Sequence, residues 1–595
     1  MSIVLDGIAA SEGIVSGPIF ELAWQVPTVP HSTVPPDQAR KEIARFAAAR
    51  AWAKESLRTL RDRTEERVGE VEARIFDPQI LMLDDPQVVD GTVLYIAQNR
   101  LSAERAFQWR MLELQNLWSR KDHPMILDRL NDLQDVMSRV LGKLLGRRDL
   151  AEVASPESEG VVVLARNLSP SLVVAWRPGV VSGIVTEQGT RSAHWVMLAR
   201  SLAIPAVVGV PDAVRRSRSS REAVVDGRAG RVVFDPDKVQ RNSFIARRDR
   251  LRAWEGEIEA IAGLESVTRD GQHVELRANL DLPDDAGPAR EHGGVGVGLF
   301  RTEFLAVGRS VMPGEEEQFR AYRAVARVFS NQVVCIRTFD LGGDKFPMFL
   351  HMPQEENPFL GWRAIRVCLD EPELFRPQLR AILRATVHGD VRPMLPFVNE
   401  IEEILRVREM LKEEEERLDA EGIPYNRGYK LGVMIETPAA ALETAHLASH
   451  ADFFSLGTND LVQYTLAVDR TNTRLTHRYE PFHPAVLSQL QLVARAGRAA
   501  GIEVSVCGEL AQNPLGAFLL LGLDIFTLSM AWPYLPEIKK FIRDIDITTA
   551  RSTARQALKA PTAREVVRTL ADGIGSAADL SLFMHRDQSS SNLSL

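Results

Sequence analysis

Cysteine is scarce in this chain, which has only three in 595 residues: Cys335, Cys368 and Cys507. Because they are odd in number and far apart, they indicate neither a disulfide framework nor a zinc ribbon. No apolar run approaches the roughly 18 residues of a membrane helix. The N-terminus carries Asp6 and Glu12 where a signal peptide has a basic start. We therefore expect a cytoplasmic protein with no membrane insertion.

An excess of basic residues is also absent. Lys and Arg total 72 against 80 Asp and Glu, giving a net charge of −8, so no basic footprint for nucleic acid exists. A P-loop is missing, and the glycines of HGGVGVG at 292–298 precede a predicted strand, so this run does not indicate dinucleotide binding. Hydrophobic residues make up 45%, as in folded globular proteins. The length suggests about three to five domains.

Two kinds of sequence alternate in the N-terminal part of the chain. Residues 1–24 and 148–237 contain short β-branched runs broken by Gly and Pro, which predict strands and turns. Residues 25–147 are mostly long, charged, Ala- and Leu-rich runs at helical spacing. We therefore expect one α/β domain interrupted by an inserted α-helical subdomain. The charged segment 238–262 predicts a linker helix.

Residues 263–575 alternate regularly between predicted strands and helices. The eight candidate strands are 274–280, 294–302, 333–340, 391–398, 430–437, 453–460, 503–510 and 525–531. Eight alternations over about 310 residues favour a closed (β/α)8 TIM barrel over an open sheet. The whole chain is thus predicted to be a multidomain α/β protein, and residues 576–595 form its polar C-terminal tail.

Polar residues follow five of the predicted barrel strands, at the strand ends where the active sites of such barrels lie. These residues are Arg301, Arg337, Glu436, Asn459 with Asp460, and Cys507. A single charge at a strand end is most often an ion-paired structural residue. Five such ends in register indicate a site.

The arginines in this region predict an acidic ligand. Guanidinium groups match phosphate and carboxylate in a bidentate manner, and the candidates are Arg301, Arg337, Arg363 and Arg470. Glu436 and Asp460 offer two carboxylates, which suits Mg²⁺ that takes its other oxygens from water and a phosphorylated substrate. The alternative is that each carboxylate pairs with one of the arginines.

The cysteines and one histidine complete the set of candidates. We expect Cys335 and Cys368 to be buried and inert, the commoner fate of such residues. A thiol beside an anionic ligand stays protonated, so Cys507 is a candidate acid. Gly189 to Ser192 predicts a turn with Ser192 as N-cap, which places His194 in the first turn of a helix. A phosphoryl group on His194 would meet the positive end of that helix; the alternative is a structural histidine.

These residues lie in long motifs, and the chain resembles enzyme I of the phosphoenolpyruvate:sugar phosphotransferase system. In the N-terminal part the motifs are GIAASEGIVSG from Gly7, IFDPQILMLDDP from Ile75 and SLAIPAVVGV from Ser201. In the predicted barrel they are GVGLFRTEFL, RTFDLGGDK, NPFLGWRAIR, GVMIETPAA, DFFSLGTNDLVQYTLAVDR and CGELA. The resemblance covers almost the whole chain.

The resemblance implies a phosphoenolpyruvate-protein phosphotransferase. Such an enzyme takes the phosphoryl group of phosphoenolpyruvate onto a histidine, here His194, releases pyruvate and phosphorylates a small histidine phosphocarrier protein (HPr-like). It implies Cys507 as proton donor and Glu436 with Asp460 as Mg²⁺ ligands. The implied ligand contacts are Arg301, Arg337, Asn459, Asp460 and Arg470. A homodimer through the barrel and a swivelling histidine domain on the linker are also implied, and we expect Arg191 to offset charge on the transferred group.

The histidine loop departs from the family pattern. The family usually reads Gly-Gly-x-Thr-Ser-His-Thr, whereas this chain has Thr190, Ala193 and Trp195 in that motif. We expect the Trp195 indole to lie beside the phosphorylated ring and to limit which carrier proteins can dock.

The sequence leaves two alternatives to this enzyme. One is a phosphoenolpyruvate synthase or pyruvate phosphate dikinase, but the helical segment is too short and Gly-poor for their ATP-binding domain. The other is a non-catalytic or regulatory phosphoenolpyruvate-binding paralogue of enzyme I, which only the departures in the histidine loop support.

Overall fold

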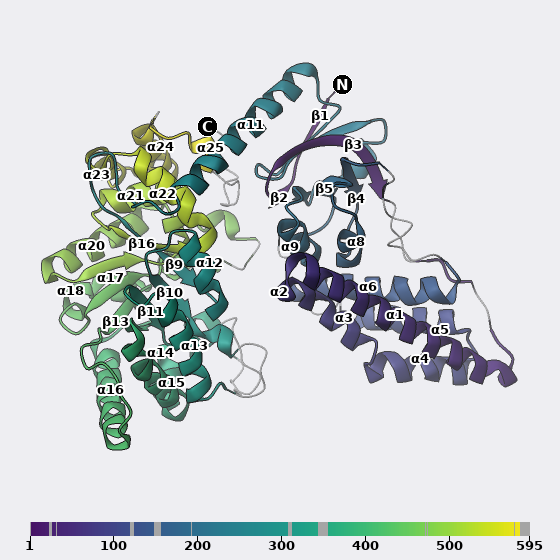
Figure 1. The fold of residues 1–595 in the computed structure, drawn as a ribbon, viewed down its shortest axis with the longest axis horizontal. Coiled ribbons are helices and arrows are strands. Elements are labelled where there is room, and N and C mark those ends of the chain that lie inside the picture. Colours follow the sequence, from purple (N-terminus) through teal and green to yellow (C-terminus); the bar gives the residue numbers. More distant parts are fainter. Residues whose placement is uncertain are drawn as a thin grey trace. The chain divides into compact units, whose positions relative to one another are not determined.

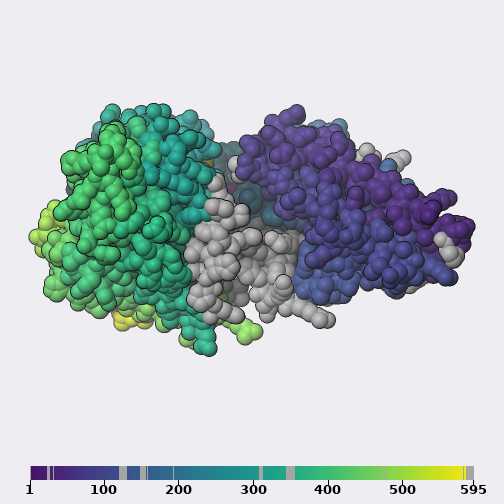
Figure 2. Space-filling view, turned by 90° about the horizontal axis from the view of Figure 1, so that it is seen from below, coloured from purple at the N-terminus to yellow at the C-terminus, as the bar shows by residue number. Residues whose placement is uncertain are grey.

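The structure is a computed structural model that describes residues 2–22, 27–30, 33–118, 124–147, 156, 158–191, 193–306, 312–342, 355–470, 472, 474–575 and 577–583. These residues form two compact units, divided between Arg252 and Ala253 (Figures 1 and 2). We call them the N-terminal unit and the barrel unit. None of the described helices is both long enough and apolar enough to span a membrane.

One eight-stranded sheet organises the N-terminal unit, in the order β1-β8-β7-β3-β4-β5-β6-β2. Its strands are β1 (Ile3–Asp6), β2 (Ile8–Ser11), β3 (Ile14–Leu22), β4 (Val161–Ala165), β5 (Val181–Thr186), β6 (Ala206–Val208), β7 (Glu222–Asp226) and β8 (Arg231–Phe234). The β-branched run of β4 is buried along its whole length, as expected for a parallel strand covered on both faces. Because β3 and β4 are parallel neighbours, the chain between them leaves and re-enters the sheet at adjacent strands.

Long helices make up the inserted segment, as its sequence pattern predicts (Figure 1). They are α1 (Ala39–Val68), α2 (Glu70–Ala73), α3 (Asp77–Met82), α4 (Pro86–Asn99), α5 (Ala103–Trp118) and α6 (Pro124–Leu144). Helix α1 buries Phe46, Ala49, Ala53, Leu57 and Leu60, and this three-to-four-residue spacing forms one apolar stripe. That stripe joins a core shared with one face of the sheet.

The linker helix α11 (Lys238–Ile261) lies where the sequence predicts one. Its first half packs on the N-terminal unit, with Arg241 bonded to Glu222 at 2.6 Å and Arg247 paired with Asp226 at 2.8 Å. Its second half contributes Trp254 to the core of the barrel unit. Each half is therefore fixed to a different unit by side chains of its own.

A closed barrel of eight parallel strands forms the second unit, which confirms the predicted (β/α)8 fold. The strands are β9 (Glu275–Leu280), β10 (Val297–Arg301), β11 (Val333–Arg337), β12 (Asp390–Leu395), β13 (Gly432–Ile435), β14 (Phe453–Leu456), β15 (Glu503–Val506) and β16 (Thr527–Ala531). The larger helices around it are α13 (Glu315–Val328), α15 (Pro372–Ala385), α16 (Ile401–Glu421), α19 (Thr458–Leu466), α20 (Pro484–Ala500), α21 (Pro514–Gly522), α22 (Leu535–Asp544), α23 (Ile547–Ala557) and α24 (Ala563–Ile574). Of the predicted tail, residues 577–583 include α25 (Leu580–Phe583), whose Phe583 ring meets Trp254 edge-on at 5.1 Å.

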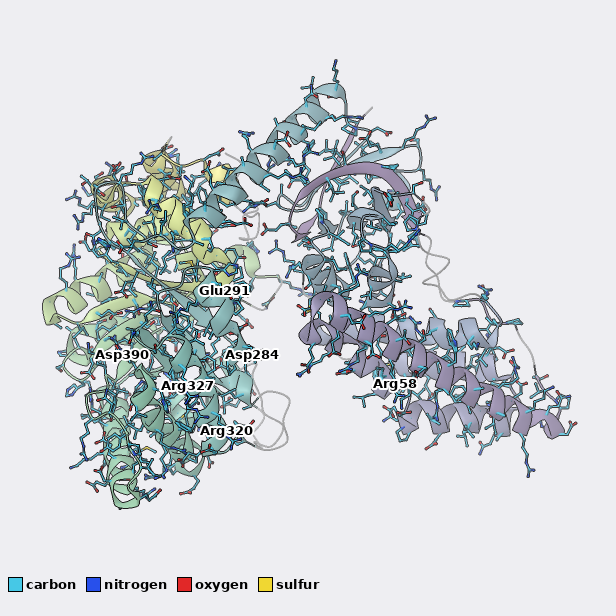
Figure 3. All side chains as sticks on the ribbon, viewed as in Figure 1. Arg58, Asp284, Glu291, Arg320, Arg327 and Asp390 are labelled. Carbon is cyan, nitrogen blue, oxygen red and sulfur yellow. The ribbon has the colours of Figure 1, made fainter. Side chains whose placement is uncertain are left out.

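Ion pairs close the N-terminal end of the barrel. Arg277 bonds Glu503 at 2.5 Å, and Arg392 bonds Asp390, labelled in Figure 3, at 2.6 Å. Cys335 is buried, and burial raises the pKa of its thiol to about 12. Burial also raises the pKa of the buried Cys368 thiol, so both thiols are inert, as the sequence predicts. This end is sealed, and the opposite end carries the open cavity.

Candidate active site

A cavity of about 250 Å³ lies at the C-terminal end of the barrel. Its walls include all eight barrel residues that the sequence predicts for the site: Arg301, Arg337, Arg363, Glu436, Asn459, Asp460, Arg470 and Cys507. Arg301 and Arg337 are the last residues of β10 and β11, and Cys507 directly follows β15. The barrel therefore brings together residues that are widely separated in sequence.

Asp340 links two of the arginines in this cavity. It accepts from Arg363 at 2.9 Å and pairs with Arg337 at 3.1 Å. Arg337 also forms a buried ion pair with Glu303, and Arg363 approaches Asp460 at 3.5 Å. Burial by itself lowers the pKa of both guanidinium groups, but the surrounding carboxylates raise it overall. Both arginines are therefore permanently charged. The sequence left open that each carboxylate pairs with an arginine, and Asp460 does so with Arg363.

Glu436 is buried, and its Oε1 atom accepts from the backbone N–H of Phe397 at 2.7 Å. Burial, then repulsion from Asp460 and Asp340, raises the pKa of Glu436 to about 8. A Cβ atom on Gly457 would lie 2.7 Å from Oε2 of Glu436, so only glycine leaves room for the carboxylate. A cation beside these carboxylates would relieve their repulsion.

The donor set fits a hard cation with few protein ligands. In the described ranges no group of three or more His, Cys, Asp and Glu side chains is arranged to hold a metal. Glu436 and Asp460, two of the carboxylates that line the cavity, would be ligands for such a cation, with other oxygens from water and substrate. That arrangement is typical of Mg²⁺ and atypical of zinc.

The thiol of Cys507 faces this charged cavity from a buried position. Its Sγ atom donates to the carbonyl of Leu456 at 3.6 Å, and the residue is 4% exposed. Burial, with the charge of Glu436 adding to it, raises the pKa of Cys507 to about 11. The thiol therefore keeps its proton at neutral pH, and burial is the main cause, ahead of the neighbouring charge.

Three polar residues sit at the rim of the cavity. Asn459 exchanges two hydrogen bonds of 3.0 Å with Glu509, one from each residue. Arg301 pairs with Asp281 at 2.9 Å and stays partly exposed. Arg470 is exposed, and within the described part of the chain no carboxylate forms an ion pair with it. The rim thus carries charges of both signs, and Arg470 is its exposed guanidinium group.

His194 is the first residue of α9 (His194–Ser201) in the N-terminal unit. Its side chain is 30% exposed, and its Nδ1 atom lies 3.4 Å from Oδ2 of Asp132 on α6. Gln79 donates to the other oxygen of Asp132 at 2.9 Å. A buried carboxylate from the helical insertion thus faces Nδ1 of the histidine.

Comparisons with known proteins identify the family. Three family models match: PEP-utilising enzyme, N-terminal, at 6–129; the mobile domain at 157–230; and the PEP-binding domain at 256–547. The phosphoenolpyruvate-protein phosphotransferase of Geobacillus stearothermophilus is 38% identical over 95% of this chain and 97% of its own. Those of Staphylococcus carnosus and Bacillus subtilis are 37% and 36% identical over 95% of this chain and 98% of theirs. The chain belongs to the phosphoenolpyruvate-protein phosphotransferase family.

The position of Trp195, next to His194 in this phosphotransferase, differs from the prediction. Trp195 is 1% exposed and belongs to the core between the helices and the sheet. The hypothesis that its indole limits carrier docking is therefore wrong, because the ring is not on the surface. Successive helical side chains point in different directions, and at this position the apolar one turns inward while His194 stays accessible.

The N-cap of α9 differs from the prediction as far as it can be described. Ser192, the predicted N-cap, lies outside the described residues, and Ala193 occupies the N-cap position without a side-chain hydrogen bond. Arg191 lies in the turn before α9 and is partly buried. Gly189 is also partly buried, and its φ of +125° lies in the region that favours glycine.

The sequence did not indicate several residues that contact the barrel-cavity residues or His194. Asp132 and Gln79 were missed because the helical insertion gave no sign of reaching His194. Phe397 and Tyr464 were missed because aromatic residues at such positions usually indicate core. Asp340 was noted only as a strand end, and its link between two arginines needs the fold to be seen.

Proposed function

We propose that this chain autophosphorylates His194 from phosphoenolpyruvate, releases pyruvate and passes the phosphoryl group to a histidine phosphocarrier protein. The observation that carries the proposal is the barrel cavity in which arginines, carboxylates and a protonated thiol converge. Phosphoenolpyruvate is small, carries phosphate and carboxylate charges, and needs a proton at its methylene carbon. The family membership supports the same conclusion.

Charge neutralisation explains how the cavity would promote transfer. Phosphoryl transfer depends mainly on positioning and on stabilising charge, and Arg337 and Arg363 are permanently charged and rigidly paired. Arg301, Arg470 and Asn459 at the rim would complete the grip. Mg²⁺, when bound by Glu436 and Asp460, would neutralise charge on the phosphate oxygens.

The two bonds that change lie on either side of the phosphorus. The phosphorus–oxygen bond of phosphoenolpyruvate breaks as a phosphorus–nitrogen bond forms at Nε2 of His194. The enolate that leaves takes the proton of the Cys507 thiol at its methylene carbon, which gives pyruvate. Solvent then returns a proton to the sulfur. A thiol whose pKa is raised to about 11 is a weak acid, but an enolate carbon is a stronger base still.

The N-terminal unit would supply the nucleophile. Asp132 faces Nδ1 of His194, and a carboxylate there favours the tautomer with its proton on Nδ1 and its lone pair on Nε2. The first turn of α9 would favour the added negative charge, and we propose that Arg191 offsets part of it.

We further propose the arrangement that the family implies. Residues 1–24 and 148–237 form the phosphohistidine domain, 25–147 the carrier-binding subdomain, 238–262 the linker, 263–575 the substrate-binding and dimerisation barrel, and 576–595 the tail. The separate anchors at the two ends of α11 support a swivel within that helix. The partners are an HPr-like carrier and a second copy of the barrel, and the location is the cytoplasm.

The experiment is labelling with ³²P-phosphoenolpyruvate in the presence of Mg²⁺. We expect an acid-labile, alkali-stable label on the full chain and none on His194→Ala. His446→Ala is the matched control, since His446 is an exposed histidine on the barrel unit bonded only to Glu443. Stable labelling of His194→Ala would overturn the proposal, as would an unlabelled parent chain. Sedimentation of the full chain from 1 to 100 µM, chosen to bracket micromolar association, tests the dimer.

The regulatory-paralogue alternative is not retained. It depended on the loop departures Thr190, Ala193 and Trp195; Ala193 and Trp195 are buried, at 2% and 1% exposure, whereas Thr190 is exposed. The relatives compared are named as phosphotransferases.

A further inference from the structure

Phe397 has an unusual backbone conformation just beyond β12. Its φ is +59, and the residue is 3% exposed. Non-glycine residues rarely occupy this left-handed region, and they persist there only where their surroundings impose it. Strain of this kind concentrates at functional sites, and Phe397 lies among groups of the proposed site.

The backbone of Phe397 is fixed on both sides by side chains. Its N–H donates to Oε1 of Glu436 at 2.7 Å, and its carbonyl accepts from Asn399 at 3.0 Å. The hydrogen bond to Glu436 leaves Oε2 of that carboxylate beside Gly457 at the cavity wall. The left-handed turn therefore orients one of the two carboxylates proposed to hold the cation.

The ring of Phe397 lies against the guanidinium group of Arg363, which lines the cavity. The guanidinium carbon of Arg363 is 4.6 Å from the ring centroid, and that of Arg366 is 5.0 Å away. Tyr464 packs on the same ring at 5.4 Å, and its hydroxyl accepts from Arg363 at 2.8 Å. An aromatic face attracts a guanidinium without using any of its N–H donors.

Arg363 is consequently held in place with part of its hydrogen-bonding capacity unused. Asp340 and Tyr464 take its terminal nitrogens, whereas its buried Nε atom has no hydrogen-bond partner among the described residues. The buried Nε atom of Arg337 is in the same condition. Buried donors without partners are costly, and here two of them belong to residues that line one cavity.

We propose that Phe397 is a positioning residue that sets Arg363 against Glu436, and so fixes the phosphate-binding group relative to the cation-binding group. Phe397 does not line the cavity itself, and it acts through these two neighbours. The ring governs the grip of Arg363 on the acidic ligand, and the backbone N–H governs Glu436. The inference rests on the proposed function of the cavity.

The two contacts can be separated by substitution. Phe397→Gly keeps the N–H and suits a positive φ, but removes the ring. Phe397→Leu keeps a buried apolar side chain and removes only the aromatic face. Phe375→Leu is the matched control, because Phe375 on α15 is a fully buried phenylalanine outside the cavity.

The test uses full-length chains that carry His194→Ala, so that phosphoenolpyruvate binds without transferring its phosphoryl group. Calorimetric titration with phosphoenolpyruvate in excess Mg²⁺ should show binding about tenfold weaker for Phe397→Leu and for Phe397→Gly, in line with a desolvated cation–aromatic contact. Phe375→Leu should bind as the parent does. The Mg²⁺ concentration for half-maximal binding should stay within about twofold for Phe397→Gly, because its N–H is retained.

Thermal melting of each chain confirms that it is folded before titration. Parent-like binding by both Phe397 variants would overturn the inference while leaving the proposed function standing. Equal weakening in Phe375→Leu would overturn it too, since the effect would then be a general one of core packing. Failure of the His194→Ala parent itself to bind phosphoenolpyruvate would instead overturn the proposed function.

Discussion

The Nδ1 atom of His194 lies 3.4 Å from Oδ2 of Asp132, and Gln79 holds the other oxygen of that carboxylate at 2.9 Å. Asp132 belongs to α6 of the inserted helices, whereas His194 begins α9 beside the sheet. The insertion therefore places a buried carboxylate beside the proposed nucleophile.

The first prediction concerns Asp132. Asp132→Ala should slow autophosphorylation about a hundredfold, because the imidazole loses the carboxylate that faces its Nδ1 atom and so part of its alignment with phosphorus, and Asp132→Asn about tenfold, because an amide oxygen keeps a polar acceptor beside Nδ1. Rapid-quench labelling measures the rate, and ¹⁵N NMR of the histidine ring measures the tautomer.

Asp135→Asn is the control for Asp132. Asp135 is also buried on α6, but it accepts from Ser171, so its replacement should lower stability without moving the tautomer. An unchanged ring tautomer in Asp132→Ala would contradict the assigned role, whatever happened to the rate.

The second prediction concerns the proposed cation. Glu436→Gln and Asp460→Asn should each raise the Mg²⁺ requirement of phosphorylation more than about tenfold, since each removes one of two protein carboxylates. Glu436→Gln should not lower the free energy of unfolding, because repulsion and burial disfavour the charged form of this residue. Titration of the labelling rate with Mg²⁺ and urea unfolding supply the two measurements. Glu443→Gln, an exposed residue outside the cavity, is the control; wild-type Mg²⁺ dependence in both cavity variants would refute the site.

The third prediction is the pH dependence of Cys507. An ordinary thiol ionises near pH 8.5, whereas burial raises the pKa of Cys507 to about 11. The folded thiol therefore keeps its proton between these values, and the thiolate fraction should rise tenfold per pH unit up to about pH 10 without levelling off. Iodoacetamide labelling, with peptide mapping to distinguish Cys335 and Cys368, measures this. A plateau near pH 8.5 would show that burial does not protect the thiol.

Linkage gives the sign of the matching effect on stability. Below about pH 8.5 the thiol is protonated in both states and contributes nothing to pH dependence. Above it the unfolded chain releases the proton and the folded chain does not, so this residue should make stability fall with rising pH until about pH 11. The slope should be absent from Cys507→Ser, so the difference in stability between the parent and this variant should show it.

The sequence predicts the barrel well because each buried parallel strand is a short apolar run that recurs along the chain. The site residues follow these runs. All eight strands are found, but several end earlier than predicted. Residues 457–460 were assigned to a strand, yet β14 ends at Leu456 and Asp460 lies in the first turn of α19. Apolar patterning marks where a strand is buried, whereas the functional residues occupy the loops and helix starts just beyond, which have no such period.

The contacts across the site were beyond prediction for a different reason. The link from Asp340 to both Arg337 and Arg363 joins the end of β11 to residues further along the connection that follows it, and the link from Asp132 to His194 joins an inserted helix to the sheet domain. A sequence lists such residues without their distances. The prediction for Trp195 was wrong because a sequence does not show in which direction a side chain points, and this residue next to the proposed nucleophile points into the core.

The final prediction follows from that burial. Trp195→Thr restores the residue usual in the family, but it removes an indole that is 1% exposed in the shared core of helices and sheet. The cavity left behind should cost about 3 kcal/mol of stability, seen as a lower urea midpoint for the N-terminal unit. Trp109→Thr, at a residue 42% exposed on α5, should cost less than about 1 kcal/mol. The range of carrier proteins phosphorylated by folded Trp195→Thr should match that of the parent, because the indole does not reach the surface. An unchanged midpoint together with transfer to carriers that the parent cannot serve would restore the docking hypothesis and contradict the position of the ring.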